Sequence, residues 1–303
     1  MTGATPPLPA RLTPGDRVVV LSPSSWPEER RHLDDLLAAL ASWGLRPELS
    51  AHVEDRRGYM AGTVADRLTD LHEALRDPGV RALVASRGGC GAIRLVHGLD
   101  GDLLRRDPKP LVGYSDITAL HQVWRRAGVP VVHGAVHGAH QDLVRRQLLE
   151  GATTTVHRDP GALTAGLTTT GTAAGVLVGG NLEMLARTVG VVDVSWEGCL
   201  LLVEANRAAG LGTVDRALSQ LRLSGALDGL TGVVVGSFEE FAGYADRGWT
   251  VLDTLHDLLD DLGVPVLGGI GTGHLDDPVP VPLGVPAVLD ADAGRLDVQP
   301  LVR

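Results

Sequence analysis

The sequence predicts an α/β protein, with an N-terminal Rossmann-like domain on a parallel sheet and a C-terminal mixed α/β domain. Three observations carry this prediction. Short β-branched runs alternate with helical periodicity in the first half, and the loops between them are short. Several of the apolar runs end directly at Ser, Gly or Glu. The 303 residues, 44% of them hydrophobic, suffice for two modest cores.

In the first half, each expected strand is followed by an expected helix. The pattern predicts strands over 16–21, 80–85, 110–114 and 129–134, and helices over 33–44, 64–75 and 117–127. Another helix is expected to begin at the glycine loop Gly88–Gly91. Strands alternating with helices in this way are typical of a parallel sheet.

The second half repeats this alternation less regularly. Strands are expected over 174–178, 199–203, 232–236 and 264–267, and helices over 182–189, 213–223 and 251–262. Short β-like pieces, broken by Pro and Gly, follow from 279 to 298. This half is therefore expected to form a mixed α/β domain.

Between the halves, residues 151–174 are rich in Thr, Ala and Gly and lack helical periodicity, which indicates a linker or a weakly patterned edge. We therefore expect an N-terminal domain over 1–155, a linker over 156–172 and a C-terminal domain over 173–303.

Composition excludes several classes of protein. The net charge of −10 disfavours nucleic acid as a partner, and no apolar run approaches the ~20 residues of a membrane span. Met1 to Ala10 has neither the basic nor the apolar region of a secretory signal. Two cysteines provide no disulfide framework, so a reducing cytoplasm is the expected location.

Three potentially reactive side chains follow predicted strands. Ser115 follows 110–114, Glu204 follows 199–203, and His274 follows 264–267 after a glycine-rich stretch. Open α/β sheets place ligands at the carboxyl ends of their strands. A hydroxyl, a carboxylate and an imidazole gathered there could act as nucleophile, orienting group and base.

Each of these residues also has a structural interpretation. Ser115 could be a helix N-cap, Glu204 a solvated strand end, and His274 an ordinary loop histidine. The segment Gly113–Ile117 lacks the last glycine of the common nucleophile elbow. If Ser115 is the nucleophile, the amide of Asp116 and one from the Gly88–Gly89 loop are candidate oxyanion donors.

Two other kinds of site remain possible on the residues alone. The glycine loop resembles a phosphate cradle, although the next glycine of a dinucleotide motif would fall at Arg94; a non-catalytic nucleotide-binding α/β protein is thus an alternative. A metallohydrolase would need histidines such as His133, His137 and His140, or His274 with Asp276 and Asp277. Broken helical spacing, and Pro278 after the second set, disfavour both metal clusters.

Seven fragments in order resemble the serine LD-carboxypeptidase family, which includes the microcin C immunity peptidases. They are Leu12–Ser25, the glycine loop Arg87–Gly91, the turn Val112–Asp116, His133–Gly134, Gly179–Leu182, Glu204 with 215–221, and Gly273–His274 with 282–284. The chain departs from the family pattern in two places. Cys90 stands where Tyr is usual, and Ala205-Asn206-Arg207 stands where the murein-recycling members tend to have further acidic residues.

The resemblance implies a Ser–His–Glu triad of Ser115, His274 and Glu204, in an active site at the interface of the two domains. It also implies neither metal nor cofactor. With Ser115 as nucleophile, the expected oxyanion donors are the amides of Asp116 and Gly89, and the expected substrate contacts are Gly88 and Tyr114. The implied enzyme is a cytoplasmic, homodimeric serine carboxypeptidase that releases a terminal D-amino acid from murein peptides. A microcin C-type immunity peptidase, which cleaves a peptidyl-nucleotide amide, is the alternative.

Overall fold

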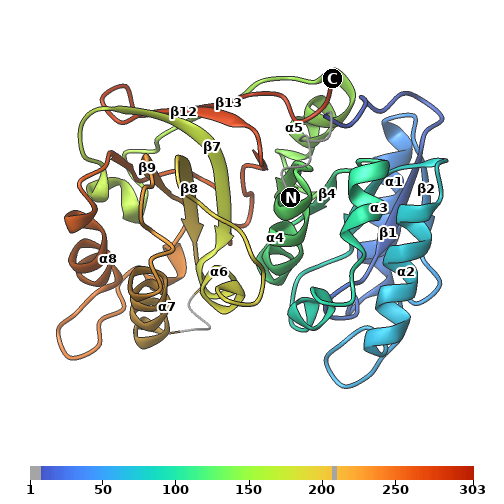
Figure 1. Ribbon diagram of the computed structural model, residues 1–303, viewed down its shortest axis with the longest axis horizontal. Helices are drawn as coiled ribbons and strands as arrows, with labels where there is room; N and C mark the ends of the chain where they lie inside the picture. Colours follow the sequence, from blue (N-terminus) through green and yellow to red (C-terminus); the bar gives the residue numbers. More distant parts are fainter. Residues whose placement is uncertain (1–7, 207–209) are drawn as a thin grey trace.

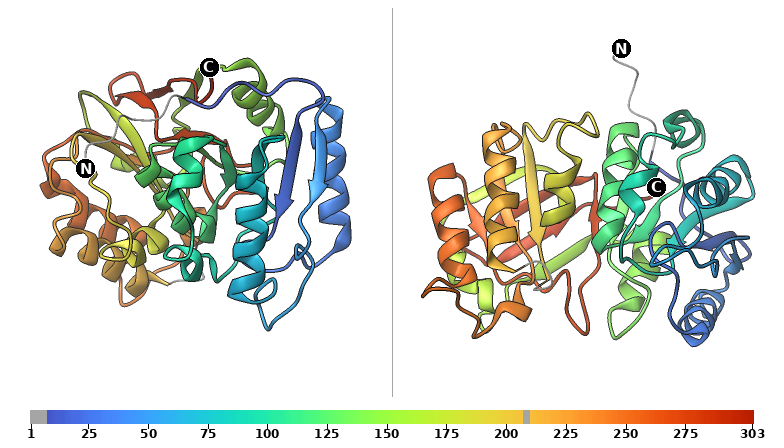
Figure 2. Two further views of the ribbon diagram at one scale, coloured as in Figure 1. Left: turned by 45° about the vertical axis from the view of Figure 1, so that its right-hand side comes forward. Right: turned by 90° about the horizontal axis from the view of Figure 1, so that it is seen from below.

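Two mixed sheets organise the chain, and each forms the centre of one lobe (Figure 1). The computed structural model describes residues 8–206 and 210–303. Most of Met1–Ala10, for which no secretory signal is expected, and Arg207 therefore lie outside the described residues. Seen from below, the lobes lie side by side (Figure 2).

The first lobe contains a six-stranded sheet in the order β11-β5-β4-β3-β1-β2. The strands from β1 to β5 are mutually parallel, and only β11 runs antiparallel. This lobe contains β1 (Arg17–Leu21), α1 (Arg30–Ser42), β2 (Arg46–Leu49), α2 (Val64–Arg76), β3 (Val80–Ala85), α3 (Gly101–Arg106), β4 (Leu111–Gly113), α4 (Thr118–Ala127), β5 (Val131–His133), α5 (Gln141–Arg145) and β11 (Val281–Leu283).

The second lobe contains a seven-stranded sheet in the order β10-β9-β8-β7-β12-β13-β6. Its four strands from β7 to β10 are parallel, and the other three add an antiparallel extension. Its elements are β6 (Thr154–His157), β7 (Thr172–Asn181), α6 (Leu182–Thr188), β8 (Cys199–Glu204), α7 (Leu211–Leu223), β9 (Gly232–Val235), α8 (Val251–Leu259), β10 (Val266–Leu267), β12 (Pro286–Asp290) and β13 (Arg295–Val298).

The sheets do not follow a single cut of the chain. β6 comes early in the sequence but pairs with β13 in the second sheet, while β11 comes late and pairs with β5 in the first. The chain thus passes three times between the two sheets, before β6, before β11 and after β11, and α4 packs against α6 where the lobes meet. The domain boundaries expected at residues 155 and 173 stay a prediction.

The expected α/β class and most expected elements are confirmed. One local prediction is wrong: the glycine loop leads into a short 3-10 turn, Ala92–Leu95, and α3 begins only at Gly101. Gly98 would place a Cβ 2.5 Å from Leu68 Cδ1, so the loop after the turn packs tightly on α2. The stretch 151–174, expected as a linker or edge, contains the whole of β6, an edge strand, and the first residues of β7.

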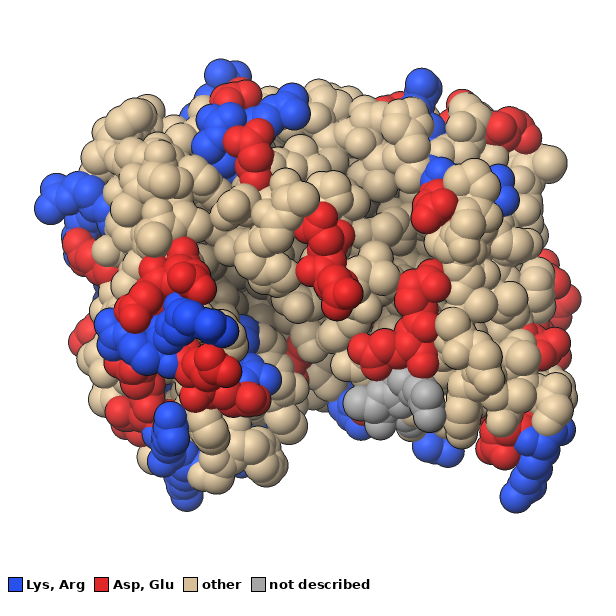
Figure 3. Space-filling view, turned by 180° about the vertical axis from the view of Figure 1, so that it is seen from behind, with Lys and Arg blue, Asp and Glu red and all other residues tan. Residues whose placement is uncertain are grey.

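The face seen from behind carries acidic and basic side chains in separate small groups around a hollow between the lobes (Figure 3). It shows no broad basic patch of the kind that nucleic-acid binding uses. Across residues 8–206 and 210–303, no helix has the length and apolar character of a bilayer-crossing segment.

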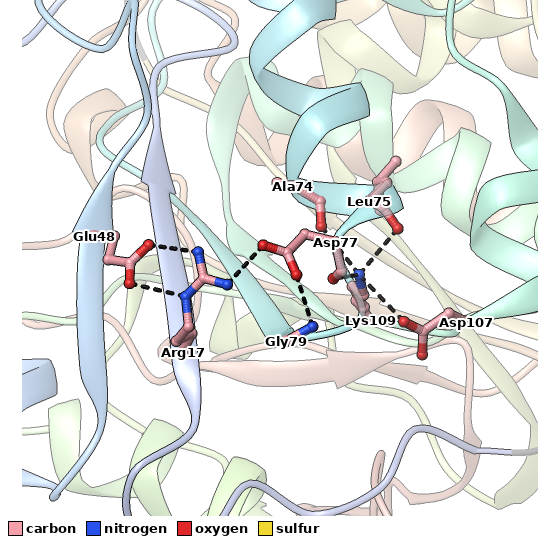
Figure 4. A network of polar contacts seen from close by, with 8 residues as sticks. All are labelled: Arg17, Glu48, Ala74, Leu75, Asp77, Gly79, Asp107 and Lys109. Atoms are coloured by element: carbon pink, nitrogen blue, oxygen red, sulfur yellow. Dashed lines mark hydrogen bonds and ion pairs between the residues drawn. The ribbon is translucent and has the colours of Figure 1, made fainter.

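The single lysine closes the C-terminal end of α2 (Figure 4). The fully buried ammonium of Lys109 donates to the carbonyls of Ala74, Leu75 and Asp77 at 2.6–3.0 Å, and its Nζ lies 3.2 Å from an Asp107 oxygen. The last carbonyls of a helix have no partners within it, so the ammonium satisfies groups that would otherwise be buried unpaired. Burial lowers the pKa of Lys109, and Asp107 partly offsets this shift.

Lys109→Met should lower the free energy of unfolding by about 2 to 3 kcal/mol, because it leaves buried carbonyls without a donor. Chemical denaturation monitored by circular dichroism measures this. Arg30→Met is the control, since Arg30 forms only exposed ion pairs and its loss should cost less than about 0.5 kcal/mol. Equal losses in the two variants would contradict the structural role of Lys109.

Candidate active site

Ser115 stands on a sharp turn between β4 and α4. Its φ is 62°, in the left-handed region that residues with a side chain rarely adopt, and it opens the 3-10 turn Ser115–Ile117 that leads into α4. A strand, a strained serine and a helix form the arrangement of a nucleophile elbow. The hydroxyl is thereby presented at the carboxyl end of the first sheet.

Of the two glycines that this turn needs, one is the first glycine of the common elbow motif and the other belongs to the glycine loop. A Cβ on Gly113 would approach Ile117 Cγ2 to 2.8 Å, and a Cβ on Gly88 would approach Ser115 Cβ to 2.8 Å. Ile117 itself is completely buried in the core. The missing last glycine is therefore no obstacle, because the close approaches fall at positions 88 and 113.

The side chain of Asp116 anchors this turn. It is buried and accepts hydrogen bonds from Ser24 Oγ at 2.5 Å and from the Ala92 amide at 2.8 Å. Burial raises the pKa of Asp116, and these hydrogen bonds partly offset the shift. The carboxylate thus ties the loop after β1 and the 3-10 turn at Ala92 to the serine, a supporting role that the sequence analysis missed.

The structure brings Ser115, His274 and Glu204 together, as the sequence analysis expects. His274 Nε2 lies 3.0 Å from Ser115 Oγ, and its Nδ1 lies 2.7 Å from Glu204 Oε2. Ser115 comes from the first lobe and Glu204 from the end of β8 in the second, so the contacts span the junction between the lobes. Distances near 3 Å allow a proton to pass between hydroxyl and imidazole.

The electrostatics of these groups follow from burial and pairing. Burial by itself raises the pKa of Glu204, but the imidazole of His133, 3.5 Å away, and that of hydrogen-bonded His274 outweigh this and lower it to about 2. Burial likewise lowers the pKa of His274, and Glu204 more than compensates, which leaves it raised. Glu204 is thus an ionised, fully buried carboxylate that stabilises positive charge on His274.

Two glycines leave room for the backbone around Glu204. A Cβ on Gly236 would lie 2.6 Å from Thr272 O and 3.1 Å from Glu204 Cβ. A Cβ on Gly273, whose φ is +114°, would lie 2.8 Å from Glu204 Cβ and Cγ. The loop that carries His274 can therefore lie directly on the glutamate, which explains the glycine before the histidine.

The glycine loop Arg87–Gly91 packs against Ser115 and is fixed by hydrogen bonds with two side chains from other parts of the first lobe. Gly89 has a φ of +119°, and a Cβ there would approach Ser25 Oγ to 2.2 Å. Ser25 Oγ accepts a hydrogen bond from the Cys90 amide. Buried Arg67 donates to the carbonyls of Gly91 and Pro23, so it joins this loop to the one after β1. The sequence analysis missed Ser25 and Arg67, and no local motif singles out either one.

Tyr114 and His133 complete the surroundings. The Tyr114 ring lies 5.3 Å from the His274 ring and 6.3 Å from the His133 ring, measured between centroids. Burial raises the pKa of Tyr114. Gly88 and Tyr114, the expected substrate contacts, thus both adjoin Ser115 or its partner histidine.

The metal-site alternatives do not assemble. His133 is fully buried beside Glu204, whereas His140 pairs with Asp277 at the surface, with 3.7 Å between its Nε2 and a carboxylate oxygen. Among the described residues, the grouping compatible with a metal is a different one: His52, Asp55 and Asp66. There, Asp66 is already engaged in capping α2 and His52 in a hydrogen bond with Asp55.

Comparison with known proteins gives the same family for both halves of the chain. Residues 18–134 match the LD-carboxypeptidase N-terminal domain, and residues 174–289 match the LD-carboxypeptidase C-terminal domain. A Streptomyces coelicolor protein named as a carboxypeptidase is 40% identical over 306 residues, covering 95% of this chain and 94% of its own.

A Bacillus subtilis relative, named as a murein peptide carboxypeptidase, is 32% identical over 294 residues, 93% of this chain and 91% of its own. Among solved structures, MccF in complex with glutamyl sulfamoyl guanosine superposes with a TM-score of 0.82. It covers 97% of this chain and 98% of that one at 22% identity, which speaks for the fold alone. By both domain matches and by its near full-length relatives, this chain is a peptidase that belongs to the LD-carboxypeptidase family.

Proposed function

We propose that this chain hydrolyses an amide bond of a small peptide with Ser115 as nucleophile, His274 as general base and Glu204 as the group that orients His274. One observation carries the proposal. The hydroxyl, the imidazole and the carboxylate form an unbroken chain of contacts of 3.0 and 2.7 Å. A serine hydroxyl is a weak nucleophile until such an imidazole takes its proton.

The proposed reaction has two halves. Ser115 Oγ attacks the scissile carbonyl and its proton moves to His274 Nε2, while His274 Nδ1–H donates to Glu204 Oε2. His274 then gives that proton to the leaving amine, which leaves an acyl-serine. A water molecule then attacks the acyl-serine while His274 takes its proton. His274 finally gives this proton to the oxygen of Ser115, which releases the acid product and restores the free enzyme.

The developing oxyanion needs backbone donors beside Ser115. We assign this role to the amides of Asp116 and Gly89. The Asp116 amide lies in the first turn after the nucleophile, where helix-type turns leave amides free. The Gly89 amide has no acceptor among the described residues, and the neighbouring Gly88 packs directly against Ser115.

The favoured substrate is a murein peptide from which the enzyme releases a terminal D-amino acid. Its support is the full-length similarity to the Bacillus relative that is named for murein peptides. Gly88 and Tyr114 are the proposed contacts for the peptide, because both border the serine or its histidine partner.

Cleavage of a peptidyl-nucleotide amide is the second candidate. MccF, whose fold this chain shares, was solved with glutamyl sulfamoyl guanosine bound. That similarity, at 22% identity, is weaker than the similarity to the carboxypeptidase relatives. A cytoplasmic location stays a prediction, with which the two free cysteines are compatible. A homodimeric state stays a prediction as well.

Ser115→Ala should reduce peptide hydrolysis to background while the melting temperature stays within a few degrees of the wild type. Removing the hydroxyl removes the nucleophile, and the smaller side chain fits the same turn. A serine-reactive phosphonate should label the wild type at Ser115, as mass spectrometry of tryptic peptides detects. Near-normal hydrolysis by the variant, or labelling elsewhere, would contradict the proposed mechanism, and unlabelled wild type would favour a non-catalytic protein.

Glu204→Gln should lower kcat by about 10⁴-fold, because a neutral amide favours the wrong tautomer of His274. The wild-type kcat/KM should fall as the pH drops through the pKa of His274, since protonated imidazole accepts no proton. That pKa lies above the usual 6.5 because of Glu204 and should decrease in the variant. An NMR titration of His274 measures this shift, and a loss in kcat of less than tenfold would exclude Glu204 from the triad.

Product analysis with two substrates should separate the candidate functions. A murein tetrapeptide that ends in D-alanine should yield free D-alanine, and a peptidyl-adenylate mimic should be cleaved at least tenfold more slowly. The matched control is the same tetrapeptide ending in L-alanine, which should be resistant. Preferential cleavage of the adenylate mimic would favour the second candidate, and activity that is lost with a chelator would indicate a metallohydrolase.

A further inference from the structure

The second oxygen of Glu204 faces an imidazole that the proposed mechanism does not use. His133 Nε2 lies 3.5 Å from Glu204 Oε1, and both side chains are completely buried. The other oxygen, Oε2, is bonded to His274. Within the described residues, neither Oε1 of Glu204 nor Nε2 of His133 has a hydrogen bond within the usual geometric limits, so two buried polar atoms without partners face each other across 3.5 Å.

The two residues reach this contact from different lobes. His133 ends β5 in the first sheet, and Glu204 ends β8 in the second. β11 pairs with β5 in a register that places Val281 opposite His133. A Cβ on Gly180, at the end of β7, would lie 3.2 Å from His133 Cε1. The ring is therefore confined by neighbours from both sheets.

Two further aromatic rings lie beside His133. The ring of His133 meets those of Tyr114 and His121 edge to face, with centroid separations of 6.3 and 6.0 Å. Burial, and then His133, lower the pKa of His121 well below its usual value, so His121 adds no positive charge here. The two imidazoles in contact with the carboxylate of Glu204 are thus those of His133 and His274.

We propose that His133 is a positioning residue, whose Nε2–H donates to Glu204 Oε1 and fixes the carboxylate plane so that Oε2 faces His274. This inference rests on the proposed function of the triad. A carboxylate attached to a flexible side chain can rotate, and a buried oxygen without a donor is costly. A donor on Oε1 removes both difficulties, and it favours the ionised form that His274 requires.

The proposal fixes the tautomer of His133, with the proton on Nε2 and none on Nδ1. NMR of the ¹⁵N-histidine-labelled wild-type protein at neutral pH reads this directly, with the His133 signals assigned by their loss in His133→Gln. We expect the Nε2–H tautomer and a change in its proton shift in Glu204→Gln. A proton on Nδ1, or a His133 signal that Glu204→Gln leaves unchanged, would overturn the proposal without any measurement of activity.

A matched pair of variants tests the effect on catalysis. Gln and Met have similar length, but only Gln offers an N–H near the position of Nε2. His133→Met should lower kcat by roughly 10- to 100-fold, the loss typical when a hydrogen-bond partner that orients a metal-ligating side chain is removed, and should change KM by less than about threefold. In His133→Gln, kcat should stay within about threefold of the wild type. His97→Met, at an exposed position, should leave kcat unchanged.

The outcomes separate this inference from the proposed function. Wild-type kcat in His133→Met, or equal losses in the Met and Gln variants at equal melting temperature, would overturn the role of His133 alone. If neither variant folds, the tautomer in the wild-type protein decides. Retained hydrolysis in Ser115→Ala would instead overturn the proposed function, whatever the tautomer of His133.

Discussion

A carboxylate buried where the two lobes meet is the constraint on which the rest of the site depends. Glu204 is completely buried at the end of an entirely buried strand, where an ionised group is costly unless opposite or donating partners surround it. No neighbour in its own strand can supply them. They come from His274, on a loop 70 residues further along the chain, and from His133 in the other lobe. The glutamate therefore favours the same arrangement that the proposed chemistry needs.

This convergence determines where the chain must have glycine. At Gly236 and Gly273 the backbone lies against Glu204, at Gly88 against Ser115, and at Gly180 against Thr118 and His133. In each case an added Cβ would lie within about 3.2 Å of its neighbour. Side chains at these positions would push the backbone away from Glu204, Ser115 and His133. These glycines thus allow the reactive side chains to come close together, because they leave room for tight packing and not because they make the backbone flexible.

Much of this arrangement could be predicted from the sequence because its signals are local. Apolar runs that end at Ser115 and Glu204 indicate strands with polar residues at their carboxyl ends, and parallel strands bring such ends to one edge. The return of β11 to the first sheet and the pairing of β6 with β13 could not be predicted, because the partners of these strands lie far along the chain. For the same reason the local sequence offered for His133 only a metal-ligand role, which it disfavoured, because its neighbour Glu204 follows 71 residues later.

The strain at Ser115 explains why so many contacts converge on its turn. A left-handed residue with a side chain costs about 1 to 3 kcal/mol and persists only where its surroundings fix it. The Asp116 carboxylate accepts two hydrogen bonds from neighbouring segments, and charge-assisted bonds of this kind contribute about 1.5 to 3 kcal/mol each, enough to offset the strain. The loop that carries His274 is fixed as well, because β11 joins the first sheet only a few residues after it. His274 in turn is hydrogen-bonded to Glu204. The chain itself therefore brings hydroxyl, imidazole and carboxylate into contact, and this geometry needs no movement of one lobe toward the other.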